Sequence, residues 1–177
     1  NKPISPREIR DLLVVSDNPE FNELRTMMSN KISEIDFDPR YSASLMPFYE
    51  KIGIFYTINI DFVASFFNHL LSLTDKEDQD QIIGDFLKSI EIFSKISFSE
   101  DKLKEKGKQI RLPYKKNMIS VDEFFVIFKK ESNIDYNTLL NLSISVEIPI
   151  LIVDCEKSYN FLLNLGMKKI LEPEKYA

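Results

Sequence analysis

The chain has 177 residues and a hydrophobic content of 44%, which suffices to bury the core of one ordinary domain or two small ones and excludes a disordered chain. Its net charge of −5 argues against recruitment of nucleic acid or an anionic membrane by bulk charge, although a local basic patch can still bind them. No apolar run reaches the roughly 20 residues that a membrane span needs, and the one cysteine, Cys155, cannot form an internal disulfide.

The first residues indicate a cytoplasmic protein without a membrane partner. The stretch from Asn1 to Leu13 lacks a signal-peptide pattern because charges interrupt its apolar run, and a first residue other than Met leaves room for missing sequence upstream. Only 4 glycines punctuate the chain, so composition favours helices over a sheet sandwich. We therefore expect a mostly α (α+β) fold, with an N-terminal helical bundle and a small C-terminal α/β element.

Three capping boxes are the clearest helix starts. They lie at Ser5–Glu8, Thr74–Glu77 and Ser120–Glu123, and each pairs an N-cap side chain with an acid three residues later. The second box predicts a helix from Asp75 to about Ile96, and the third predicts one from Val121 to about Glu131. A further helix is expected to open at Asn18 and Pro19 and to run toward Ile35.

Two apolar stripes at helical spacing predict a helical hairpin before the second box. The first stripe comprises Leu45, Phe48, Ile52 and Phe55, and the second comprises Val63, Phe66, Phe67, Leu70 and Leu71. Each stripe must be covered by another helix. Residues 1–98 are therefore expected to form the helical bundle, with most of the second stripe inside.

A short pattern in the same region resembles a family of uncharacterised small helical domains from bacteria and archaea. The matching positions are Glu50, Ile52, Gly53, Ile60 and Asp61, while Thr57–Asn59 stand where the family has a link glycine. The resemblance covers about residues 9–73. It implies a helical fold and no catalytic activity.

The composition of the chain changes after Ser99. Residues 99–119 are strongly charged and lack a sustained apolar stripe, so we predict a linker here, or a short hairpin around Pro113. Residues 120–177 are expected to form the small α/β element, with a second helix from about Tyr136 to Ile144. The apolar, β-branched run Ile148–Val153 predicts a buried strand. A helix should follow it and end at Gly166, before a last strand in the "MKKIL" stretch.

The end of that strand, "VDC", is the most plausible edge for an active site. Ligands gather beyond the carboxyl ends of strands and at helix N-termini. However, Asp154 and Glu156 flank Cys155, and carboxylates disfavour a thiolate. We predict that Asp154 is the N-cap, that Cys155 is a buried, unreactive side chain, and that Glu156 is a first-turn acid.

No other catalytic or metal-binding pattern stands out. His69 is the only histidine, which excludes His-rich metal sites, and its apolar helical setting predicts a packed or half-buried side chain. A dyad of His69 with Cys155 stays open, because such partners meet in space rather than in sequence. The acidic run from Asp75 to Phe86 lacks the glycine and glutamate of a calcium loop. We expect no enzyme activity, no metal and no cofactor.

The best positive feature is a basic segment, which we define as residues 102–116. Only Glu105 opposes its cations, and an exposed tyrosine on a turn can stack on an unpaired base. An ordinary solvated linker is the simpler interpretation of the same residues. The candidate nucleic-acid-binding residues are Lys102, Lys104, Lys106, Lys108, Arg111, Tyr114, Lys115 and Lys116.

These observations favour a non-enzymatic protein-binding or regulatory subunit. Its partner is expected to be another protein or a second copy of the chain, docking on the aromatic-rich helical bundle. The alternative is an accessory nucleic-acid-binding protein that uses the basic segment.

Overall fold

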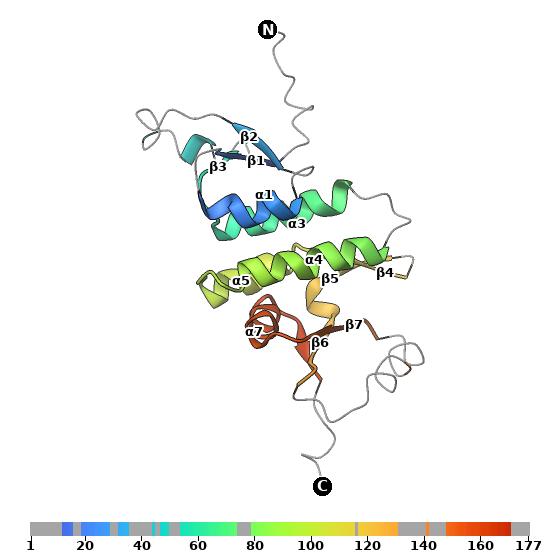
Figure 1. Ribbon diagram of the computed structural model, residues 1–177. Helices are drawn as coiled ribbons and strands as arrows, with labels where there is room; N and C mark the ends of the chain where they lie inside the picture. Colours follow the sequence, from blue (N-terminus) through green and yellow to red (C-terminus); the bar gives the residue numbers. More distant parts are fainter. Residues whose placement is uncertain are drawn as a thin grey trace. The chain divides into compact units, whose positions relative to one another are not determined.

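The computed structural model describes residues 12–15, 19–28, 32–35, 44, 47–49, 54–73, 79–115, 117–130, 141 and 148–170. The helix expected from Ser5 lies outside these residues, as does nearly all of the one expected from Tyr136. The chain divides into two compact units, Asn1–Asp78 and Gln79–Ala177. The division therefore falls between residues 78 and 79, and the predicted linker 99–119 belongs to the second unit (Figure 1).

The first unit is a mixed α/β structure, so the predicted N-terminal helical bundle is wrong. Its sheet has three parallel strands in the order β2-β1-β3 (Figure 1). Leu12 pairs with Ile32, and Leu13 pairs with both Ser33 and Ile54. The elements of this unit are β1 (Leu12–Val15), a 3-10 turn η1 (Pro19–Phe21), α1 (Asn22–Met28), β2 (Ile32–Ile35), β3 (Ile54–Phe55) and α3 (Ile60–Leu73).

The helical bundle was predicted wrongly because several short apolar runs of the first unit are strands. The four residues of β1 are all apolar, which suits the central strand of a parallel sheet. The helix expected from Asn18 to Ile35 ends at Met28, and its last residues form β2 instead. Phe55, which helical spacing assigned to a helix, lies in β3. Strand pairing within the sheet thus overrides a local period of 3.6 residues.

The helix α3 contributes most of the described core of the first unit, as was predicted from the second of the two apolar stripes. Asn59 caps it, since the backbone N–H of Phe62 donates to Asn59 Oδ1 at 2.8 Å. The Phe62 ring is fully buried and lies 5.2 Å from the centroid of Phe21 and 5.3 Å from that of Phe55. The stripe residues Val63, Phe66, Phe67 and Leu70 are all buried.

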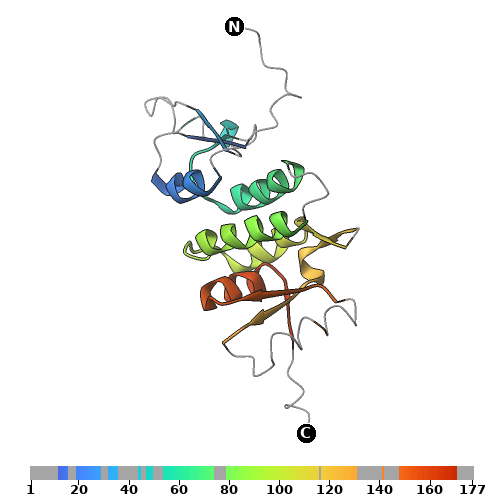
Figure 2. The ribbon, with the colours of Figure 1, turned by 45° about the vertical axis from the view of Figure 1, so that its right-hand side comes forward.

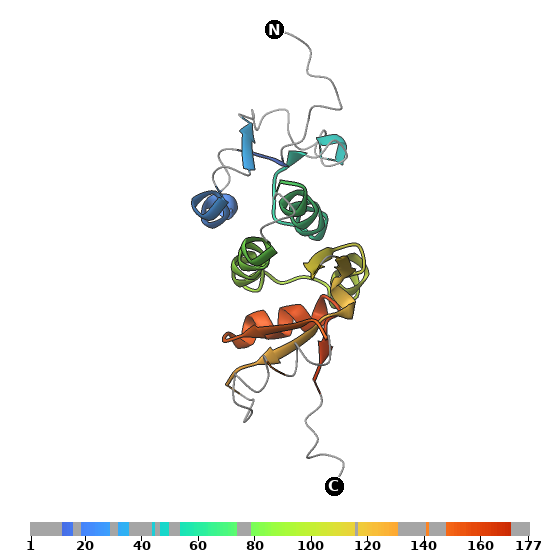
Figure 3. The ribbon, with the colours of Figure 1, turned by 90° about the vertical axis from the view of Figure 1, so that its right-hand side faces the viewer.

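The second unit holds two sheets and three helices among its described residues. A parallel sheet has the order β7-β6-β8, and a separate hairpin pairs β4 with β5 antiparallel. The helices α4 and α7 lie side by side in Figure 2, and α7 covers one face of β6 and β7 in Figure 3. The elements are α4 (Gln79–Phe93), α5 (Glu100–Gly107), β4 (Arg111–Tyr114), β5 (Asn117–Ser120), a 3-10 turn η3 (Val121–Glu123), β6 (Phe125–Phe128), β7 (Ile150–Val153), α7 (Glu156–Asn164) and β8 (Lys168–Lys169).

The capping box at Ser120 forms, but it opens a single 3-10 turn. Glu123 Oε1 accepts the backbone N–H of Ser120 at 3.2 Å. The helix expected as far as Glu131 is wrong, because Phe125–Phe128 is the central strand β6, paired on both sides. Its aromatic and β-branched side chains suit a buried strand and are poorer helix formers.

The strand, helix and glycine stop expected at the C-terminal end are confirmed. Gly166 follows the C-cap Leu165 with φ of +111°, and its N–H donates to the carbonyl of Leu163. The N–H of Met167 donates to the carbonyl of Leu162, which completes a Schellman motif. None of the helices in the described part of the chain is long and apolar enough to cross a bilayer.

Candidate nucleic-acid interface

The basic segment covers most of α5 and the first strand, β4, of the β4–β5 hairpin, together with Lys115 of its turn. The N–H of Val121 donates to the carbonyl of Ile110 at 3.0 Å, and the Ser120 hydroxyl donates to the carbonyl of Lys108 at 3.5 Å. These bonds hold the base of the hairpin beside the end of α5. Leu112 is fully buried, so the hairpin is anchored in the core rather than being a solvated linker.

Most of the predicted basic side chains are exposed. Lys106 and Tyr114 are half-buried, and Lys116 lies outside the described residues. The exposed members are Lys102, Lys104, Lys108, Arg111 and Lys115.

The helix α5 is not a uniform basic face. Its buried side is marked by Leu103 and Gly107. Helical periodicity places the lysines in two rows that flank this side, with Asp101 and Glu105 between the rows on the outer surface. Cations in the last turn also interact favourably with the helix dipole, which accounts for Lys104 and Lys106 without a ligand. Nucleic-acid binding therefore rests on the hairpin more than on the helix.

The tip of the hairpin has an unusual backbone. Lys115 has φ of +53°, the left-handed region that glycine and asparagine adopt more easily. Its Nζ lies 5.6 Å from the centroid of the Tyr114 ring, and that ring meets Phe124 edge-on at 6.3 Å. Backbone strain of this kind costs of order 1 kcal/mol or more. Glycine or asparagine at position 115 would form this turn more easily than lysine does. The geometry of the turn therefore does not explain the lysine.

Cys155 is exposed, which makes the prediction of a buried cysteine wrong. It is the N-cap of α7, the place that was expected for Asp154. The backbone N–H of Ser158 lowers the pKa of the thiol most, and that of Lys157 acts in the same direction. Partial burial and the charge of Glu91 raise the pKa, but the balance is a lowered value. From the sequence, the flanking carboxylates were expected to outweigh the unpaired N–H groups of the helix start, and the direction of the pKa shift is the opposite.

Among the described residues, the other predicted site residues form no catalytic group within either unit. His69 is half-buried in α3, as expected, and it belongs to the first unit whereas Cys155 belongs to the second. Asp154 is exposed and pairs with Lys129, with 3.6 Å between Oδ1 and Nζ. Over the ranges that the structure describes, no group of three or more His, Cys, Asp or Glu side chains could hold a metal ion.

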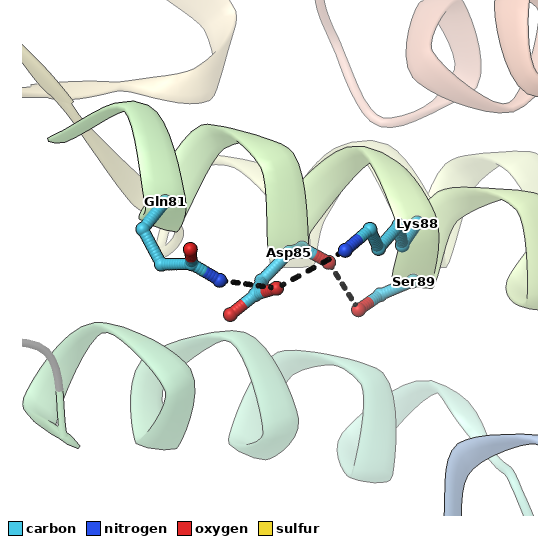
Figure 4. A network of polar contacts seen from close by, with 4 residues as sticks. All are labelled: Gln81, Asp85, Lys88 and Ser89. Carbon is cyan, nitrogen blue, oxygen red and sulfur yellow. Dashed lines mark hydrogen bonds and ion pairs between the residues drawn. The ribbon is translucent and has the colours of Figure 1, made fainter. Parts of the chain in front are cut away.

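A polar network on α4 was missed by sequence reasoning (Figure 4). Asp85 is buried, and its Oδ1 accepts from Gln81 Nε2 at 3.1 Å and lies 3.9 Å from Lys88 Nζ. The Ser89 hydroxyl donates to the backbone carbonyl of Asp85 at 2.7 Å. The spacing of Gln81 and Asp85, four residues apart, was the available signal. All four residues lie on α4, and their contacts stabilise a buried carboxylate.

Comparison of the chain with protein-family models, curated proteins and solved structures found no significant match in any of the three.

Proposed function

We propose that the protein acts by binding rather than by catalysis, and that the β4–β5 hairpin binds single-stranded nucleic acid. The observation that supports this proposal is Lys115, a cation at the strained tip of an anchored hairpin, directly beside the half-buried ring of Tyr114. Exposed cations neutralise phosphates, and a tyrosine face stacks on unpaired bases. Lys108 and Arg111 extend the positive surface toward the base of the hairpin.

The protein-binding function has less support after the fold is known. It rested on a helical bundle, and the first unit is not one. Among the described residues, the large apolar side chains that are exposed are Phe48 at 59% and Met118 at 43%, and they belong to different units. A single exposed apolar side chain in either unit does not form a docking patch. A protein partner or self-association therefore stays a prediction, to be checked by light scattering and by co-purification.

Neutralising the hairpin is expected to abolish binding to single-stranded DNA or RNA without unfolding the protein. The variant combines Lys108→Ala, Arg111→Ala and Lys115→Asn. Asparagine tolerates the left-handed conformation at position 115, so the turn should be at least as stable as before. Fluorescence anisotropy with a labelled oligonucleotide measures the affinity, and chemical denaturation checks the fold.

The matched control removes three exposed lysines from other parts of the second unit, by Lys130→Ala, Lys157→Ala and Lys169→Ala. It has the same change in net charge and should bind like the wild type. Three phosphate contacts predict a log–log salt slope of about −2 on single strands, so raising the salt fourfold weakens binding about 20-fold. Equal loss in both variants would show bulk charge rather than a site. No binding by the wild type at low salt would end the proposal.

Stacking by Tyr114 is tested separately. Tyr114→Leu keeps an apolar side chain against Phe124 but removes the aromatic face, and it should weaken binding by about 1–3 kcal/mol, roughly 5- to 150-fold. Tyr114→Phe retains the ring and should bind like the wild type. Equal affinities for the leucine and phenylalanine variants would show that the ring does not stack on a base.

A further inference from the structure

The thiol of Cys155 stands at the carboxyl edge of a parallel sheet, immediately before a helix. β7 ends at Val153, and α7 begins at Glu156 with Cys155 as its N-cap. As the N-cap, Cys155 stands before the unpaired N–H groups of the first turn of α7, without a regular hydrogen bond from them to its sulfur, and its side chain is exposed to solvent. The backbone groups of Ser158 and Lys157 lower the pKa of the thiol. A reagent can therefore reach a sulfur whose anion is stabilised by the start of the helix.

A second, independent feature points to the same sulfur. The Ser158 side chain is only 3% exposed, and within the described part of the chain its hydroxyl has no hydrogen-bond partner of regular geometry. A buried hydroxyl without a partner costs free energy. Ser158 lies three residues after the N-cap Cys155, in the same first turn of α7, and its hydroxyl lowers the pKa of the thiol. A thiolate accepts a hydrogen bond far better than a neutral thiol does, so the hydroxyl is satisfied best when the sulfur is charged.

The charges around the sulfur are mixed and favour certain reagents. Glu91 on α4 opposes the thiolate, and the neighbours Asp154 and Glu156 are both exposed acids. Lys129, which follows β6, pairs with Asp154 and offsets part of its charge. Lys157 is the other cation close in sequence. Three carboxylates against two ammonium groups should repel an anionic reagent and attract a cationic one.

We propose that Cys155 is a modification site that forms a mixed disulfide with a small disulfide of neutral or positive charge. The Cys155 thiolate attacks one sulfur of the reagent, and a new S–S bond forms as the S–S bond of the reagent breaks. The second half of the reagent leaves as a thiolate and takes a proton from water. The small disulfide is the only oxidant that the reaction needs. This site is independent of the hairpin and of any nucleic acid.

The test measures the reaction of the folded, full chain with cystamine, with 2-hydroxyethyl disulfide and with oxidised glutathione. Mass spectrometry should find one adduct per chain at Cys155 and none in Cys155→Ser. The rate should rise with pH around a midpoint lower than that of the same chain unfolded in urea. Cystamine should react faster than the neutral reagent, and oxidised glutathione should react most slowly.

Ser158→Ala tests whether Cys155 reacts because its thiolate is stabilised or only because its side chain is exposed. Removal of a buried hydroxyl without a partner should leave the fold intact, which chemical denaturation verifies. The variant should shift the midpoint of the rate profile to higher pH and slow the reaction at neutral pH. A midpoint in the wild type at or above that of the unfolded chain would overturn the proposal, as would an unchanged profile in Ser158→Ala. Fastest reaction with oxidised glutathione would overturn the charge preference.

Discussion

Gly107→Ala is expected to destabilise the second unit more than an alanine at either of the other described glycines, Gly84 and Gly166. An added Cβ would lie 1.7 Å from the backbone carbonyl oxygen of Leu165 and 2.8 Å from its carbon. The contact is with backbone, so no side-chain rotation relieves it. The ends of α5 and α7 must move apart, and overpacking of this kind costs about 1–3 kcal/mol or more. We expect the free energy of unfolding to fall by about 3 kcal/mol.

Gly84→Ala is the matched control. It adds the same methyl group in the interior of α4, where nothing lies within 4 Å of the new Cβ. Alanine is the better helix former, so this variant should gain about 0.5–1 kcal/mol. Chemical denaturation measures both variants under the same conditions. If Gly107→Ala and Gly84→Ala changed the stability equally, Gly107 would lie farther from the backbone of Leu165 than the structure shows.

Phe62→Ala should cost the first unit about 3–5 kcal/mol, the range for removal of a buried phenylalanine. The ring is fully buried and lies among three others, those of Phe21, Phe55 and Phe66. These rings come from η1, β3 and α3, so the cavity would loosen the contact between helix and sheet. Hydrogen exchange of the α3 amides should accelerate strongly, while exchange in the β6 strand should change little.

Phe48→Ala provides the comparison within the same unit. Its side chain is 59% exposed, so its removal should change the stability by no more than about 0.5 kcal/mol. If Phe48→Ala destabilised the first unit as much as Phe62→Ala, the assignment of the core to α3 would be wrong. Chemical denaturation and exchange of the same α3 amides decide between these outcomes.

Several features of the second unit could be predicted because they depend on a few neighbouring residues. Gly166 ends α7 since its positive φ is one that glycine adopts without a steric penalty. The Ser120–Glu123 box forms because both of its groups lie within one turn. The run from Ile150 to Val153 is too short for a helix and too apolar for a loop, which leaves a buried strand. The resemblance seen at residues 9–73 stays a prediction, as do the absence of enzyme activity and the cytoplasmic location.

The candidate site was predicted in part. Its basic residues were visible in the sequence, and the hairpin around Pro113 is confirmed, although its turn lies at Lys115. The two acids on the outer side of α5 and the strain at Lys115 emerged only from the structure. Cys155 was expected to be buried, with the acids beside it outweighing the effect of the helix start on its thiol. Its exposure and its place at the start of α7 depend on where that helix begins, which the sequence placed one residue too early.

The sequence by itself determined the caps, the turns and the apolar runs, because each of these depends on contacts within a few residues. Only the tertiary structure decided that the runs Leu12–Val15 and Phe125–Phe128 are strands rather than parts of helices. Each is the central strand of a parallel sheet, and its residues pair with partners that lie from 20 to 43 positions away along the chain. A run of four apolar residues satisfies a helix and a strand equally well in isolation. The backbone hydrogen bonds and the burial that favour the strand exist only after those distant partners have come together.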